Sequence, residues 1–284
     1  MANTEKRENK GILRGIPHDK VESNLGILAT FIAILVAVGG IVEIVPPFYL
    51  DDAVPPAEGV RPYTPLELEG YVVYRREGCF YCHSQMIRPF RDEKERYGHF
   101  SLAAESKFDH NFVWGSKRTG PDLARVGGKY SDAWHIQHFR APRSVVPESV
   151  MPNFPWLHDT PLDTSKTQAR MRILQSMDVP YSDDDINNAL NDLVAQAAMD
   201  DGRGEAAFRA RYERKRWVTS DGEVEQWTDD FVPTPVNVRN FDGNPKQITE
   251  LDALIAYIQS RGTMVHFEEG IDYYHDKFGR PYRK

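Results

Sequence analysis

The sequence predicts an all-α protein, with one apolar helix near the N-terminus followed by a helical globular domain. Three observations support this prediction. Leu25 to Val42 is a continuous run without a charged residue, several later segments repeat apolar residues at helical spacing behind a capping residue, and Cys79–His83 spells C-x-x-C-H.

Composition limits the classes of function. The chain has 284 residues, of which 40% are hydrophobic and 27% charged, and its net charge is -7. This acidic balance, with no basic patch between aromatic residues, predicts no nucleic-acid partner. The only two cysteines, Cys79 and Cys82, both belong to the motif, so no disulfide framework is expected.

We expect residues 25–46 to form a transmembrane helix, because a helix of ~20 apolar residues spans a bilayer. A cleaved signal peptide is the alternative, but its apolar region would be shorter and would end in an A-x-A-like site. Glu43 interrupts the run near its end, and would either contact a polar partner helix or lie at the membrane interface.

Flanking charges predict the orientation of this helix. The preceding segment, residues 1–24, is rich in Lys and Arg, whereas the following segment carries Asp51, Asp52 and Glu58 before its first arginine at position 61. Positive charge stays on the cytoplasmic side. The sequence therefore predicts a single-pass protein of a bacterial inner membrane, with residues 60–264 exported to the periplasmic side.

The pentapeptide Cys79-Phe80-Tyr81-Cys82-His83 is the attachment sequence for one covalent haem c. Its two thiols would bond the vinyl groups of the porphyrin, and His83 would be an axial ligand of the iron. A thioredoxin-like dithiol, part of a zinc site and a disulfide are the alternatives. The sequence shows no βαβ pattern, which a thioredoxin-like dithiol would need. It also shows no second pair of ligands, which a zinc site would need.

The iron needs a sixth ligand, and Met151 is the best candidate. It lies on a loop before Pro152, some 70 residues after the motif, as in small cytochromes c. Met264 is its strongest competitor. In the same fold a G-P-x-L loop accepts the N–H of the proximal imidazole, which assigns that role to Pro121 in Gly120–Leu123. Arg125 and Arg143 are candidate partners of the haem propionates.

Helical spacing predicts helices over 67–78, over 132–140 with Ser131 as N-cap, and over 250–261 with Thr249 as N-cap. Together they predict a class I cytochrome c-like haem domain at residues 60–264. An insertion at about 160–247 would precede its last helix, and residues 265–284 would be a C-terminal tail. Within the insertion we expect a helix capped by Ser182 and Asp185, a helix over 203–217 and a loop over 222–244.

Long runs resemble the mono-haem cytochrome c subunit, subunit II, of cbb3-type cytochrome c oxidases. These runs are 79–91, 95–106, 114–128, 142–152 and 242–245, and the resemblance spans most of residues 20–264. The segment at 200–240 and the aromatic tail depart from the family.

The resemblance implies that this chain accepts electrons from a sister cytochrome c subunit. It would deliver them to the catalytic haem–copper subunit, where oxygen is reduced. His83 and Met151 would be the axial ligands, and no oxygen chemistry would occur on this chain. Two alternatives stay open: the mono-haem subunit of a nitric oxide reductase, and a membrane-tethered dithiol protein without haem.

Overall fold

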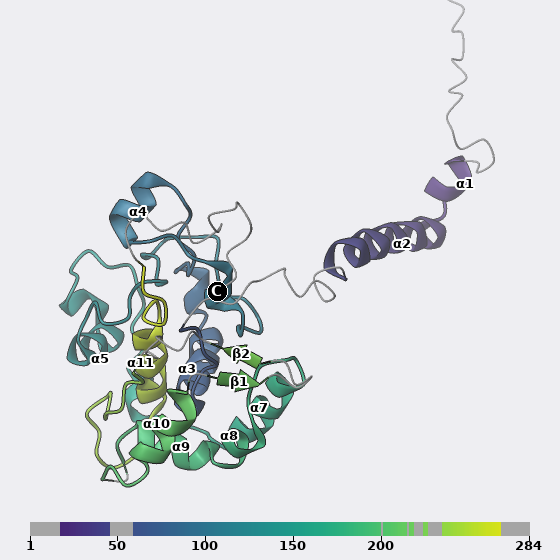
Figure 1. Ribbon diagram of the computed structural model, residues 1–284. Coiled ribbons are helices and arrows are strands. Elements are labelled where there is room, and N and C mark those ends of the chain that lie inside the picture. The colour runs from purple at the N-terminus through teal and green to yellow at the C-terminus, as the bar shows by residue number, and fades with distance from the viewer. Residues whose placement is uncertain are drawn as a thin grey trace, which may run out of the picture. The chain divides into compact units, whose positions relative to one another are not determined.

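The computed structural model describes residues 18–45, 59–199, 201–214, 216–218, 224–226 and 235–267. The chain divides into two units, Met1–Ala53 and Val54–Lys284, and Figure 1 labels most of their helices and both strands. The described part of the first unit holds α1 (His18–Glu22) and α2 (Leu25–Ile44).

Helix α2 is the predicted apolar helix. It begins behind Asn24, whose side chain accepts a hydrogen bond from the Ile27 N–H at 3.1 Å. A window of 18 of its 20 residues has a mean hydropathy of 2.7, and no residue of the helix is buried within the structure. At 1.5 Å per residue the helix is about 30 Å long, which is the thickness of the hydrocarbon core of a bilayer. It therefore has the length and composition of a membrane span.

The second unit is helical, which confirms the predicted fold class. In chain order its elements are α3 (Pro65–Arg76), η2 (Cys79–Tyr81), α4 (Arg91–Tyr97), η3 (Ala103–Ser106), α5 (Asp132–Arg140), η4 (Pro142–Ser144), α6 (Trp156–Asp159), α7 (Thr167–Gln175), α8 (Asp183–Asn187), α9 (Ala189–Gln196), α10 (Glu205–Tyr212), β1 (Arg216–Val218), β2 (Val224–Gln226) and α11 (Glu250–Ser260).

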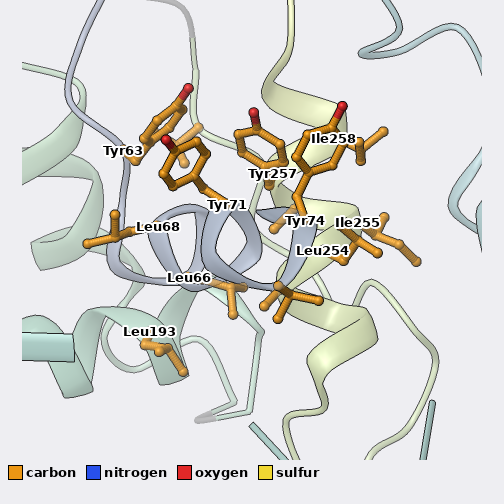
Figure 2. Close-up of a cluster of buried hydrophobic side chains, with 14 of the residues drawn as sticks. Tyr63, Leu66, Leu68, Tyr71, Tyr74, Leu193, Leu254, Ile255, Tyr257 and Ile258 are labelled. Atoms are coloured by element: carbon orange, nitrogen blue, oxygen red, sulfur yellow. The ribbon is translucent and has the colours of Figure 1, made fainter. Parts of the chain in front are cut away.

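The core of this unit is the contact between α3 and α11 (Figures 1 and 2). Each helix begins with a capping box, made by Thr64 with Glu67 and by Thr249 with Asp252. Gly70 brings the helices together, because a Cβ atom there would lie 1.9 Å from the Ala253 carbonyl oxygen. The aromatic rings of the two helices meet beside this contact.

Figure 2 shows those rings gathered on one side of α3. The Tyr257 ring of α11 lies 5.7 Å from Tyr71 and 5.4 Å from Tyr74, measured between ring centroids. Tyr63, just before α3, lies 5.6 Å from Tyr257 with its ring turned edge-on. Edge-to-face contacts of this kind add about 0.5–1.5 kcal/mol to the burial of the rings.

The described residues of the predicted insertion are an integral part of this core, although the insertion is rich in polar and charged residues. Helices α7 and α9 both contact α3. Thr167 donates a hydrogen bond to the buried carboxylate of Glu69 at 2.6 Å, and Arg170 forms an ion pair with the same carboxylate. The Tyr181 hydroxyl donates to the Tyr63 carbonyl oxygen at 2.7 Å.

Two expectations for the insertion need correction. The helix capped by Ser182 and Asp185 forms with both cap bonds, but the chain leaves α8 at Asn188 before α9 begins. The helix expected over 203–217 ends at Tyr212 with α10. Arg216–Val218 instead forms β1, which pairs antiparallel with β2. Strand β2, Val224–Gln226, lies inside the segment that was expected to be a loop.

We predict that Gly70→Ala destabilises the second unit. The new methyl group would collide with backbone atoms of α11, which cannot rotate away, so the free energy of unfolding should fall by about 3 kcal/mol. Thermal unfolding of the detergent-solubilised chain measures this. Gly39→Ala is the control, since a Cβ atom there meets nothing within 4 Å. Equal melting temperatures for the two variants would contradict the close contact.

Candidate functional site

The two cysteines lie on one turn directly after α3. Gly78, with φ of +72°, reverses the chain, and η2 begins at Cys79. The N–H groups of Cys82 and His83 both donate to the Cys79 carbonyl oxygen, at 3.1 and 3.0 Å. Both thiols are free. We call residues 78–86 the attachment loop.

The two thiols differ in environment. Cys79 is partly buried and packs against the hydrophobic core, and burial raises its pKa to about 12. Cys82 is exposed. One thiol therefore lies at the core and the other at the surface of the same turn.

His83 is oriented by Pro121, as the G-P-x-L loop predicted. Its Nδ1 atom lies 2.8 Å from the Pro121 carbonyl oxygen. A carbonyl oxygen only accepts, so Nδ1 carries the proton and Nε2 presents a lone pair. Burial lowers the pKa of His83, and the Pro121 carbonyl opposes this only in part. The imidazole is therefore neutral and directed as a metal ligand must be.

Residues 119–124, which we call the proline loop, pack closely against this imidazole. A Cβ atom at Gly120 would lie 2.2 Å from the Cε1 atom of His83. The Gly120 N–H donates to the Cys82 carbonyl oxygen at 3.0 Å, and the Leu123 N–H to that of Ser84 at 2.8 Å. The attachment and proline loops are thus joined by backbone bonds on either side of His83.

Met151 lies on the loop after η4, partly buried and packed against the core. Its N–H donates to the Ser149 hydroxyl at 3.2 Å, and the Phe154 N–H donates to the Phe139 carbonyl oxygen of α5 at 2.8 Å. Met264, the competing ligand, is also partly buried against the core. The choice between the two sulfur atoms stays a prediction.

The two candidate propionate partners have other contacts. Arg125 forms two parallel hydrogen bonds with Glu105, at 2.6 and 2.8 Å. The Nε atom of Arg143 donates to the Ser149 carbonyl oxygen at 3.0 Å, so Arg143 braces the loop that carries Met151. Their contacts with propionates stay predictions.

His138 was not predicted from the sequence as a residue of interest. Its ring stacks on Trp134 with centroids 4.4 Å apart, and its Nδ1 atom is buried without a hydrogen-bond partner among the described residues. Burial lowers the pKa of His138. The sequence did offer one indication: His138 follows Trp134 by four residues on the helix predicted over 132–140, which places the two side chains on the same face of that helix.

These residues fit a haem. Two free thiols and a histidine lie on one turn, the histidine keeps Nε2 for a metal, and a buried imidazole nitrogen of His138 lacks a hydrogen-bond partner among the described residues. A zinc site has no such support, since no three His, Cys, Asp or Glu side chains gather as a metal site within the described ranges.

A family model described as "Cytochrome C oxidase, mono-heme subunit/FixO" matches residues 18–265. The chain belongs to this family. No curated protein matches the chain in sequence. Membership implies a haem, a role in electron transport and an assembly with other oxidase subunits, and it agrees with α2 as a membrane anchor. The match favours the oxidase over the nitric oxide reductase.

We predict that Gly120→Ala impairs haem binding in this member of the family. The methyl group would push the imidazole out of line with Pro121, so the variant should carry less than about a tenth of the parent's haem, as second-shell changes commonly cost 10–100-fold. Haem absorbance per polypeptide measures it. The control is Thr119→Ala, an exposed neighbour on the same loop. Full haem content in Gly120→Ala would contradict the prediction.

Proposed function

We propose that this chain is the membrane-anchored electron carrier of a cbb3-type oxidase, with one haem c held by thioether bonds to Cys79 and Cys82. Electrons would arrive from a sister cytochrome c subunit and leave to the catalytic haem–copper subunit. The observation that carries this proposal is the hydrogen bond between His83 Nδ1 and the Pro121 carbonyl oxygen, made on the same turn as both thiols.

His83 and Met151 are the axial ligands in this proposal. The haem supplies one-electron redox chemistry when bound, and a His/Met pair gives it a higher potential than two histidines would. The Pro121 carbonyl holds the imidazole in one orientation and increases its basicity. With both His83 and Met151 holding the iron, oxygen reduction would belong to the partner subunit.

The anchor would place the haem domain on the periplasmic side of a bacterial inner membrane. Lys and Arg lie before α2 and acidic residues follow it, which is the arrangement expected when the N-terminus stays in the cytoplasm. An exported domain suits covalent haem attachment, which bacteria carry out on that side of the membrane.

We predict that the purified chain is heavier than its polypeptide by one haem. The haem should stay with the chain after denaturation, because thioether bonds survive where iron coordination does not. Intact mass and haem staining on a denaturing gel measure this. Cys79→Ser combined with Cys82→Ser should abolish the stain, while either single variant should keep a reduced amount. A parent chain with the bare polypeptide mass would overturn the proposal and favour a dithiol protein.

We predict that Met151→Leu removes the weak red absorption of methionine-ligated ferric haem and lowers the potential. Leucine has a similar volume but no sulfur, so the fold should lose less than about 1.5 kcal/mol. Met264→Leu is the matched control, since it makes the same exchange at the competing candidate. Absorption spectroscopy and redox titration of both variants decide which methionine is the ligand. Loss of the band in Met264→Leu alone would reassign the ligand.

A further inference from the structure

A buried carboxylate follows Pro121, the acceptor of the His83 hydrogen bond, and has no role in the function proposed above. Asp122 follows Pro121 in the proline loop, and its side chain is fully buried. One of its oxygens accepts hydrogen bonds from the Ser84 hydroxyl at 2.6 Å and from the Met86 N–H at 3.0 Å. The other accepts from the Ala124 N–H at 2.8 Å.

Arg118 completes this arrangement. Its Nε atom donates to the Ser84 hydroxyl at 2.7 Å, and one terminal nitrogen lies 2.7 Å from Glu93 and 3.3 Å from Asp122. The same nitrogen donates to the Met86 carbonyl oxygen at 2.8 Å. The negative charge of Asp122 is therefore buried beside a cation. Its two oxygens accept hydrogen bonds from residues of both the attachment loop and the proline loop.

These bonds bear on His83 because they join the residues next to His83 and Pro121. Ser84 is the residue after His83, and Asp122 is the residue after Pro121. The Ser84–Asp122 bond thus lies one residue beyond the His83–Pro121 bond and fixes the spacing of the backbones that carry the imidazole and its acceptor. A change in that spacing alters the length of the imidazole hydrogen bond.

We propose that Asp122 is a positioning residue that sets the haem potential, acting through Ser84 on the hydrogen bond between His83 and Pro121. This inference rests on the proposed function. A well-made bond to Pro121 makes the imidazole more basic and stabilises ferric iron. The Asp122 carboxylate also adds negative charge beside the loop that carries His83, which would favour the ferric form. Both effects lower the potential.

The test is redox titration of the full-length, haem-loaded chain in detergent. Asp122→Asn keeps the shape but presents an N–H₂ group to donors, so it should loosen both loops and remove the charge. We expect the redox equilibrium to shift about tenfold toward ferrous haem, a rise of about 59 mV for one electron. Ser84→Ala keeps the charge and removes the hydroxyl that bonds to both Asp122 and Arg118, so it should raise the potential less. Ser84→Thr should restore it.

Asp185→Asn is the matched control. Asp185 is an equally buried carboxylate that accepts from a backbone N–H and pairs with Arg214, but among the described residues it makes no hydrogen bond or ion pair with either loop. It should lower the melting temperature without moving the potential.

Three outcomes overturn the inference: an unchanged potential in both Asp122→Asn and Ser84→Ala, an equal shift in Asp185→Asn, or a Ser84→Thr variant that behaves like Ser84→Ala. If Asp122→Asn does not fold, the two Ser84 variants still decide. A parent chain without covalent haem would instead defeat the proposed function, so the two failures are distinguishable.

Discussion

The close contact between α3 and α11 is the constraint on which the rest of the second unit depends. It requires the absence of a side chain at Gly70, and it brings Tyr257 beside Tyr71 and Tyr74. From this position the Tyr257 hydroxyl donates to the side-chain oxygen of Gln85 at 3.0 Å. Gln85 lies two residues after His83 in the attachment loop. One hydrogen bond therefore connects this loop to the contact between α3 and α11, two helices that are far apart in the sequence.

The burial of α3 explains why the insertion cannot be a loose appendage. Glu67 and Glu69 are both nearly inaccessible to solvent, although each carries a carboxylate. A buried charge is tolerated only when it is paired and hydrogen-bonded. Arg61 supplies two bonds of 2.8 Å to Glu67, whereas Glu69 depends on Thr167 and Arg170 of the insertion. The carboxylates of the helix that leads into Cys79 are therefore both satisfied only when α7 packs against it.

The features predicted from sequence are those that local patterns determine. The apolar run of α2, the Ser131 cap of α5 and the Thr249 cap of α11 each depend on a few neighbouring residues. The link between His83 and Pro121 was also predictable, but only because a known loop pattern relates two positions 38 residues apart.

The features that were missed depend on contacts between distant segments. The pairing of β1 with β2 needs a partner strand, although Trp217 and Val218 favour extended structure more than the helix expected there. Asp122 gave no signal within its tetrapeptide, because its partners Ser84 and Met86 belong to another loop. Nor does a lone histidine in α5 show that one of its ring nitrogens is buried without a partner among the described residues.

The two sides of the site are built with unequal rigidity. Around His83, backbone bonds join Cys82 to Gly120 and Ser84 to Leu123, and buried side chains reinforce them. The loop that carries Met151 is held by fewer bonds, chiefly from Arg143 and from Phe154 to α5. The turn that carries both thiols and His83 is therefore fixed by its contacts with the proline loop, and these contacts do not involve Met151 or its loop.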